Sequence, residues 1–196
     1  MALGQDDGKR SLSAVAVPAG PKLDGEVRAD PVWQAVTPAT GFIQSLPDEG
    51  QPASQRTEVR VVYTNDAIFF SFVCYDDDPA TIVVSDARRD ASLADTDSLL
   101  FIVDTYRDEQ NGFVFGTNPV ALQYDGQLSK AGQGGSLSSG SMSGAGGGFN
   151  LNWDGVWDVK TQVGEFGWSA EFRIPFKTLR YSNKDRHGWG INFQRN

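Results

Sequence analysis

Apolar and polar side chains alternate from Trp168 to Ile174. A period of two residues is typical of a β-strand that turns one face into a core and the other toward water or a partner. Pro175 follows and has no N–H to donate to a sheet ladder, so we expect the strand to end there or to lie at an edge. The same alternation returns at Trp189 and predicts a closing strand that includes Phe193.

The clearest β-hairpin lies in the first half of the chain. Residues 57–63 and 67–75 are rich in valine, isoleucine and phenylalanine, and residues 64–66 between them tolerate turn geometry. Strands with so few polar residues are expected at the centre of a sheet that is covered on both faces. Two more strands are predicted on either side of a polar turn, at 98–103 and 113–118.

Strand patterns dominate the chain, and no amphipathic helix of useful length interrupts them. This pattern predicts an all-β fold, a single-domain antiparallel β-sandwich with a jelly-roll-like arrangement. We expect residues 1–10 to form a polar tail and residues 11–196 to form the sandwich domain. A chain of 196 residues is long enough for one such domain with a well-filled core.

A loop rich in glycine and serine is inserted at residues 128–150. Residues 131–148 alone contain eight glycines and five serines. Such a composition buries too little apolar surface to offset the entropy lost on ordering, so the isolated segment is expected to be mobile. A partner surface is the simplest means of holding it. Its candidate contacts are the large apolar side chains Leu137, Met142 and Phe149.

Composition excludes several classes of function. The chain carries 17 basic and 25 acidic side chains, a net charge of −8, whereas binding to nucleic acid needs a basic surface. The only cysteine, Cys74, excludes an internal disulfide and is expected to be a small core residue. The only histidine, His187, cannot build a histidine-rich zinc or iron site.

Aspartates gather between residues 76 and 97. Calcium needs several oxygen ligands, which loop aspartates and backbone carbonyls supply, although the spacing here matches no EF-hand loop. Two interpretations stay open: a calcium site, or turn caps and ion pairs with Arg88, Arg89 and Arg107. The candidate metal ligands are Asp76, Asp77, Asp78, Asp95 and Asp97.

Two polar and aromatic groups are candidate ligand contacts. Sugar-binding sites stack aromatic faces on a pyranose and read its hydroxyls with amides and carboxylates. Trp153 with Asn152 and Asp154 suits that chemistry, and packing of the indole into the sandwich is the alternative. The second group lies in the polar turn after residue 103 and is expected to project from the rim of the sheet. It consists of Tyr106, Arg107 and Asn111.

Four stretches carry a resemblance to a known family. Lys22-Leu23-Asp24-Gly25 running to Trp33, residues 57–63, Trp153-Asp154-Gly155-Val156-Trp157 and residues 167–196 together resemble the family 9-like carbohydrate-binding domains of bacterial envelope proteins. In many relatives such a domain lies ahead of an outer-membrane β-barrel. The resemblance implies a carbohydrate-binding β-sandwich of the bacterial cell envelope, in the periplasm or outside the cell, and calcium is a feature of related sugar-binding sandwiches.

The sequence itself carries no membrane or export signal. It has no apolar run of about 18 residues, so it predicts no transmembrane segment. The first ten residues lack the basic start and apolar stretch of a signal peptide. The expected envelope location therefore comes from the resemblance alone.

Two functional hypotheses follow. The first is a non-catalytic carbohydrate-binding module, since glycosidase chemistry needs two carboxylates facing one cleft at about 5–10 Å and the sequence singles out no such pair. The second is an accessory or scaffolding subunit docked on the periplasmic face of a larger membrane protein complex, of the respiratory or photosynthetic type. The loop at 128–150 and the absence of an evident pair of sugar-clamping tryptophans favour the second.

Overall fold

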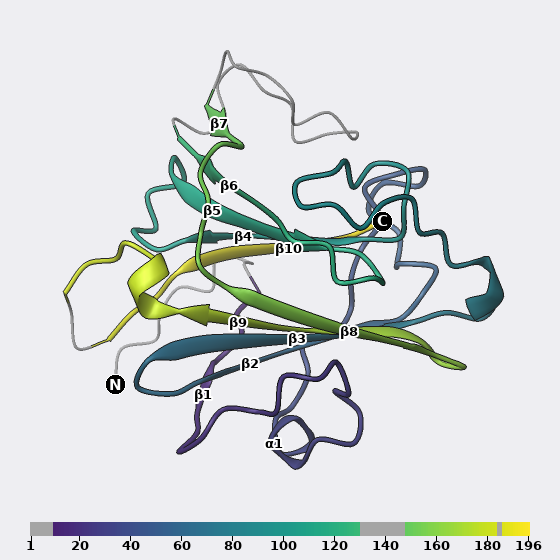
Figure 1. The fold of residues 1–196 in the computed structure, drawn as a ribbon, viewed down its shortest axis with the longest axis horizontal. Coiled ribbons are helices and arrows are strands. Elements are labelled where there is room, and N and C mark those ends of the chain that lie inside the picture. The colour runs from purple at the N-terminus through teal and green to yellow at the C-terminus, as the bar shows by residue number, and fades with distance from the viewer. Residues whose placement is uncertain (1–9, 130–147, 184–185) are drawn as a thin grey trace.

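Two five-stranded sheets pack face to face as a β-sandwich (Figure 1). The computed structural model describes residues 10–129, 148–183 and 186–196. In the first sheet the strands lie in the order β1 (Val15–Ala16), β2 (Thr57–Tyr63), β3 (Ala67–Tyr75), β9 (Gly167–Pro175) and β8 (Asp158–Gly164). In the second sheet the order is β10 (Gly190–Arg195), β4 (Leu99–Asp104), β5 (Gly112–Thr117), β6 (Tyr124–Leu128) and β7 (Phe149–Asn150).

Strand directions confirm the predicted antiparallel β-sandwich, with one exception. Strand β1 runs parallel to β2, whereas the other neighbouring strands in both sheets are antiparallel. The hairpin of β2 and β3 has the predicted bounds, and β9 ends at the proline that was expected to stop it. Helical structure in the described residues is short: α1 (Pro31–Gln34) and the 3-10 turns η1 (Pro79–Thr81) and η3 (Phe176–Thr178). None of these helices is long and apolar enough to cross a bilayer.

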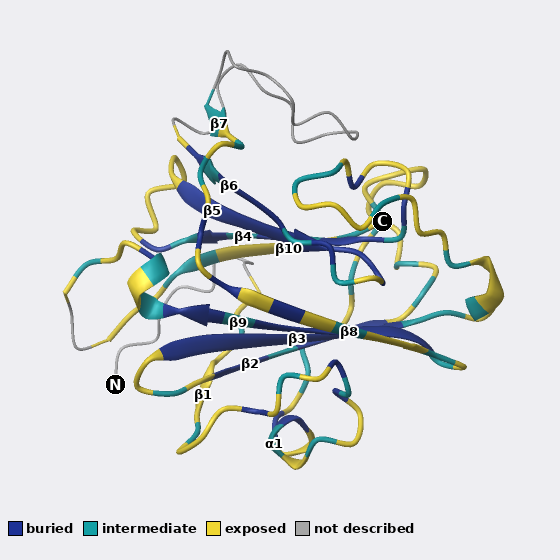
Figure 2. Cartoon of the chain, viewed as in Figure 1, coloured by how far each residue is buried: buried dark blue, intermediate teal, exposed yellow. Residues whose placement is uncertain are grey.

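The main core fills the space between the two sheets (Figure 2). Its centre is a group of phenylalanine rings from both sheets. The Phe101 ring of β4 lies 4.7 Å from Phe70 of β3 and 5.0 Å from Phe172 of β9, centroid to centroid. Tilted and edge-on arrangements at these distances suit the charge distribution of aromatic rings. Cys74 is fully buried in this core, as predicted, and burial raises the pKa of its thiol to about 12.

The outer face of the first sheet is also covered. The segment that contains α1 lies against it (Figure 2), and Val27, Trp33 and Val36 pack on Phe69 and Val73. This second apolar cluster explains why β3 is buried along almost its whole length. A third cluster, which includes Leu93, Val114, Leu122 and Tyr124, covers the outer face of the second sheet.

A buried carboxylate fixes the α1 segment to the sheet. Glu171 of β9 has no exposed surface. Its Oε2 accepts the main-chain N–H groups of Asp24 at 2.9 Å and Gly25 at 2.6 Å, and its Oε1 accepts the indole N–H of Trp33 at 2.7 Å. From here on these contacts are called the Glu171 clamp. At Glu171 and Ser169 the polar face of β9 therefore meets the chain's own N-terminal segment and not solvent.

The local sequence positions the groups that donate hydrogen bonds to Glu171. Gly25 has φ +88°, and a Cβ there would lie 2.5 Å from the carbonyl carbon of Thr161, so no larger residue fits. Asp30 caps α1 by accepting the N–H of Val32 at 2.7 Å, and Pro31 occupies the first helical position. These two features place the Trp33 indole over the sheet.

An arginine on the closing strand links the two sheets. Arg195 of β10 is half-buried, and its Nη1 donates to the carbonyl oxygen of Tyr75 at 2.9 Å and to that of Arg56 at 3.2 Å. Its Nη2 lies 3.7 Å from the Asp76 carboxylate. At the other end of the chain, residues 1–9 of the predicted tail lie outside the described residues, and the Arg10 guanidinium donates to the Gly41 carbonyl.

The Trp33 hydrogen bond predicts a difference between two tryptophan-to-phenylalanine substitutions. Trp33 and Trp168 are both buried, but among the described residues the Trp168 indole N–H has no hydrogen-bond partner. Trp33→Phe should therefore lower the free energy of unfolding by about 1.5–3 kcal/mol more than Trp168→Phe, because only the first loses a hydrogen bond to a charged group. Urea denaturation at neutral pH measures both. Equal losses would show that the indole–carboxylate contact adds no stability.

Burial raises the pKa of Glu171, which predicts a pH dependence of stability. The native protein keeps a proton at pH values where the unfolded chain has released it. The stability that protonated Glu171 adds to the free energy of unfolding is therefore fully present below the pKa of the unfolded chain. It is lost as pH rises through the pKa of Glu171 in the native protein. Urea titrations between about pH 4 and pH 8 should show this loss in the wild type and not in Glu171→Gln. The same slope in both proteins would assign the pH dependence to other groups.

Candidate functional site

The turn between β4 and β5 presents three of the predicted ligand contacts. The Asp104 carboxylate accepts the N–H groups of Tyr106 at 3.1 Å and Arg107 at 2.7 Å. Asp108 accepts the side-chain amide of Asn111 at 2.7 Å, and this hydrogen bond with two main-chain N–H groups lowers the pKa of Asp108. The turn is thus shaped by its own aspartates. The side chains of Tyr106, Arg107 and Asn111 are exposed, and ligand binding by them stays a prediction.

Trp153 covers one end of the main core. Its ring centroid lies 5.1 Å from that of Phe113 and 6.0 Å from that of Phe115, and the side chain is partly buried. Asn152 and Asp154 on either side are exposed. The contacts of this group are with Phe113 and Phe115 of β5 and, through Asp154, with Arg89.

A buried aspartate holds the turn that carries Trp153. Asp125 of β6 is 1% exposed, and burial raises its pKa. It accepts the N–H of Gly155 at 2.7 Å and a guanidinium N–H of Arg89 at 2.5 Å. The same guanidinium pairs with Asp154. The position of Trp153 is therefore set by contacts of its neighbours with the second sheet.

An aromatic cluster that the sequence analysis did not select lies between β9 and β10. The Tyr181 ring lies 5.2 Å from His187 and 5.8 Å from Trp189, and the Trp189 ring lies 6.4 Å from Phe176. Tyr181 is 37% exposed and His187 is exposed, whereas Trp189 is partly buried against the core. The cluster thus offers aromatic surface to solvent on a base that is anchored in the sandwich.

This aromatic cluster lies beside the β4–β5 turn. Gly190 pairs with Asp104 in the sheet, and the Thr105 hydroxyl donates to the carbonyl of Arg180. A Cβ on Gly188 would lie 3.9 Å from Nη1 of Arg107. Predicted polar contacts and unpredicted aromatic rings therefore share one end of the molecule. We call this surface the aromatic rim and define it as Tyr106, Arg107, Tyr181, His187 and Trp189.

The inserted loop lies largely outside the described residues. Leu137 and Met142 belong to that part. Phe149 is described and pairs with Leu128 across β6 and β7. Its ring stacks on Tyr124 at 6.4 Å with an interplanar angle of 10°. The described end of the loop is thus attached to the second sheet, and partner binding through the three apolar side chains stays a prediction.

The candidate calcium ligands take part in turns and ion pairs. Asp76 accepts the N–H of Asp78 at 2.9 Å, Asp97 accepts the N–H of Val83 at 2.8 Å, and Asp77 accepts the Gln55 amide at 3.4 Å; Asp95 is exposed. In the described ranges no three side chains of the ligand types gather as a metal site. Calcium binding by these aspartates stays a prediction, and a chelator should lower the Tm if it holds.

Comparison with known proteins identifies the fold. No protein-family model and no curated protein sequence matches the chain. Among solved structures, the chain matches a family 9 carbohydrate-binding module from Caldicellulosiruptor kristjanssonii in complex with cellotriose, with TM-score 0.57 and 18% identity over 94% of this chain and 76% of that one. A family 9 module from the same organism in complex with glucose gives TM-score 0.58 and 15% identity, with 94% and 78% covered. The chain has the fold of these carbohydrate-binding modules.

A third match agrees with this assignment of fold. A candidate carbohydrate-binding protein from Bacteroides uniformis superposes with TM-score 0.62 and 12% identity over 94% of this chain and 82% of that one. The resemblance predicted from the sequence motifs is confirmed at the level of the fold. At such low identity the matches do not transfer a ligand or individual contact residues.

The packing of Trp153 predicts that it stabilises the fold. Trp153→Ala should lower the free energy of unfolding by about 2–4 kcal/mol, because it removes a ring that covers Phe113 and Phe115. Tyr106→Ala is the matched control at the same end, and with 55% of Tyr106 exposed it should change stability by less than about 0.5 kcal/mol. Urea denaturation of the two variants decides between core packing and an open sugar platform. A Trp153→Ala protein as stable as the wild type would favour the platform.

Proposed function

We propose that the protein is a non-catalytic carbohydrate-binding module and that the aromatic rim is its sugar-binding surface. The observation that carries the proposal is the fold shared over 94% of the chain with modules solved in complex with glucose and cellotriose. Glucose and cellotriose are ligands of those two modules. For this chain they indicate which class of ligand to test first, a glucose-based saccharide.

The aromatic rim has the chemistry that this ligand class requires. Pyranose rings present an apolar face of C–H groups and an edge of hydroxyls, so they need an aromatic surface with hydrogen-bonding groups around it. Tyr181 and Tyr106 supply exposed aromatic surface, 37% and 55% exposed respectively. Arg107 and His187 add exposed polar groups beside them. Phe176 and Trp189 pack against the Tyr181 ring and hold it in position.

The carboxyls of the described residues support binding without hydrolysis. A glycosidase needs a carboxylic acid whose raised pKa keeps its proton and which reaches the glycosidic oxygen. Glu171 and Asp125 have raised pKa values, but they are 0% and 1% exposed and accept hydrogen bonds within the fold. In the β4–β5 turn beside the rim, hydrogen bonds lower the pKa of Asp108, which favours its ionised form over the acid.

The bacterial cell envelope, in the periplasm or outside the cell, is the location we propose with this function. It follows from the resemblance to envelope domains seen in the sequence motifs. The alternative role, an accessory subunit docked on the periplasmic face of a respiratory or photosynthetic membrane complex, depends on the loop at 128–150. Most of that loop lies outside the described residues, so the alternative stays a prediction.

Cellotriose binding tests the proposed surface. Tyr181→Ala should weaken binding up to about tenfold, because one stacking ring is lost. Tyr63→Ala is the matched control: Tyr63 is 39% exposed but lies on β2, and the described structure gives it no ring contact with the rim. Isothermal titration calorimetry measures the affinity and thermal unfolding checks the fold. Equal weakening by both variants would remove the rim as the site, and no binding of cellotriose or other neutral glycans by the wild type would contradict the function itself.

A further inference from the structure

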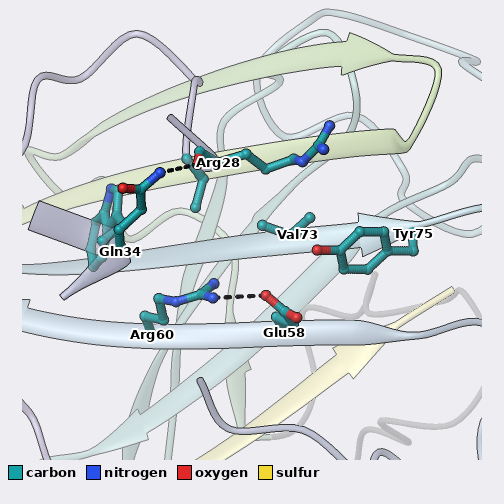
Figure 3. A pocket seen from close by; sticks show the side chains of 8 residues that line it. Arg28, Gln34, Glu58, Arg60, Val73 and Tyr75 are labelled. Atoms are coloured by element: carbon teal, nitrogen blue, oxygen red, sulfur yellow. Dashed lines mark hydrogen bonds and ion pairs between the residues drawn. The ribbon is translucent and has the colours of Figure 1, made fainter. Parts of the chain in front are cut away.

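A pocket opens on the outer face of the first sheet, beside α1 (Figure 3). Its volume is about 130 Å³, and it lies between the segment that carries Arg28 and Gln34 and the strands β2 and β3. Val73 contributes to the apolar part of its lining. Its polar lining consists of Arg28, Gln34, Glu58, Arg60 and Tyr75.

Positive charge exceeds negative charge at this pocket. Glu58 is 4% exposed, and its carboxylate is shared by two guanidinium groups. Arg60 pairs with Oε2 of Glu58 at 2.8 Å, and Arg56, which lies 4.7 Å over the Tyr75 ring, pairs with Oε1. One carboxylate therefore faces two guanidinium groups before Arg28 is counted. This excess is local, because the whole chain has a net charge of −8.

Arg28 supplies a guanidinium whose donors are available. It stretches along the wall opposite Glu58 and Arg60 (Figure 3), and its guanidinium carbon lies 4.4 Å over the Phe166 ring. Among the described residues no carboxylate pairs with it and no acceptor takes its side-chain N–H groups. Stacking on an aromatic ring holds the planar group in place and leaves its edge free to bind an anion.

Two neutral groups complete the polar lining. The Gln34 amide is fixed, because its nitrogen donates to the Arg28 carbonyl at 2.9 Å. The Tyr75 hydroxyl points into the pocket (Figure 3). Two other carboxylates of this region are already engaged: Glu26 accepts the main-chain N–H groups of Arg28 at 3.2 Å and Ala29 at 3.3 Å, and Glu171 accepts three N–H groups in the clamp. An incoming anion therefore meets donors on several sides and the Glu58 carboxylate on one.

We propose that this pocket binds the carboxylate group of an acidic sugar, a hexuronate residue of a glycan. The identity of the ligand as a sugar rests on the proposed function; the selectivity for a carboxylate rests on the pocket. A guanidinium edge matches a planar carboxylate with two parallel hydrogen bonds. A phosphate dianion fits less well, because its second charge is repelled by Glu58, which is too buried for water to screen.

Size limits how much of the ligand enters. Pockets that enclose a whole small molecule usually measure roughly 300–1,000 Å³, whereas this one measures about 130 Å³. The space accommodates a carboxylate and the carbon that bears it, and the sugar ring stays at the mouth. The pocket thus selects the acidic substituent of a saccharide, and neutral glucose gains nothing from it.

The test compares D-glucuronate, D-glucose, sodium acetate and inorganic phosphate by calorimetry on the full chain. The wild type should bind glucuronate at least about tenfold tighter than glucose, acetate or phosphate, and Arg28→Gln should remove that advantage by losing a charge-assisted hydrogen bond. Arg28→Lys keeps the positive charge but loses the guanidinium edge that makes two parallel hydrogen bonds, so it should retain part of the preference for glucuronate. Arg88→Gln is the control, because Arg88 is an exposed arginine paired with Asp86 on another loop.

The outcomes separate this inference from the proposed function. If glucuronate and glucose bind equally, or if Arg28→Gln and Arg88→Gln weaken glucuronate binding alike, the proposal of a carboxylate-binding pocket is wrong, and the proposal of sugar binding at the rim is unaffected. If acetate or phosphate binds as tightly as glucuronate, the pocket is a general anion site and the acidic-sugar assignment is overturned. If Arg28→Gln abolishes tight glucuronate binding while Tyr181→Ala leaves it intact, the inference holds and the pocket is independent of the aromatic rim.

Discussion

The Glu171 carboxylate is the point on which the arrangement of the first sheet depends. It lies on a central strand, faces away from the main core and has no contact with solvent. A carboxylate in that position is costly unless several donors surround it, and the main-chain N–H groups of Asp24 and Gly25 and the Trp33 indole supply them. The clamp makes the buried carboxylate the point at which the α1 segment is attached to the first sheet.

Both proposed binding surfaces follow from the way the sheets are covered. The α1 segment, held by the clamp, forms one wall of the pocket that contains Arg28, so that pocket exists only when the segment is docked. The aromatic rim lies elsewhere, where the connection from β9 to β10 packs against the β4–β5 turn. One surface offers aromatic faces and the other an excess of positive charge. Together they suit a saccharide that carries both neutral and acidic residues.

The β-sandwich could be predicted from the sequence because strand patterns are local. The hairpin of β2 and β3 has the predicted bounds, and Pro175 ends β9. The contacts that join distant parts of the chain could not be predicted from these local patterns. The alternation around Glu171 indicates a polar face but not that Trp33, 138 positions away, covers it. Tyr181 and Trp189 flank a polar turn, and only the fold shows that their rings meet and that Gly188 lies beside Arg107. The sequence predicts a covered strand at residues 57–63, but only the fold shows that Arg60 donates to the carbonyl of Val36 beside α1.

The measurement that tests the central claim most directly is a two-dimensional NMR titration of the full chain with cellotriose. Amide signals from residues 105–111, 180–183 and 186–190 should shift together and saturate. Signals of the Glu171 clamp should stay in place, because a saccharide at the rim leaves the docked α1 segment undisturbed. Shifts confined to another surface would relocate the site. A spectrum unchanged at saturating cellotriose, and unchanged again with other neutral glycans, would contradict the account of this protein as a carbohydrate-binding module.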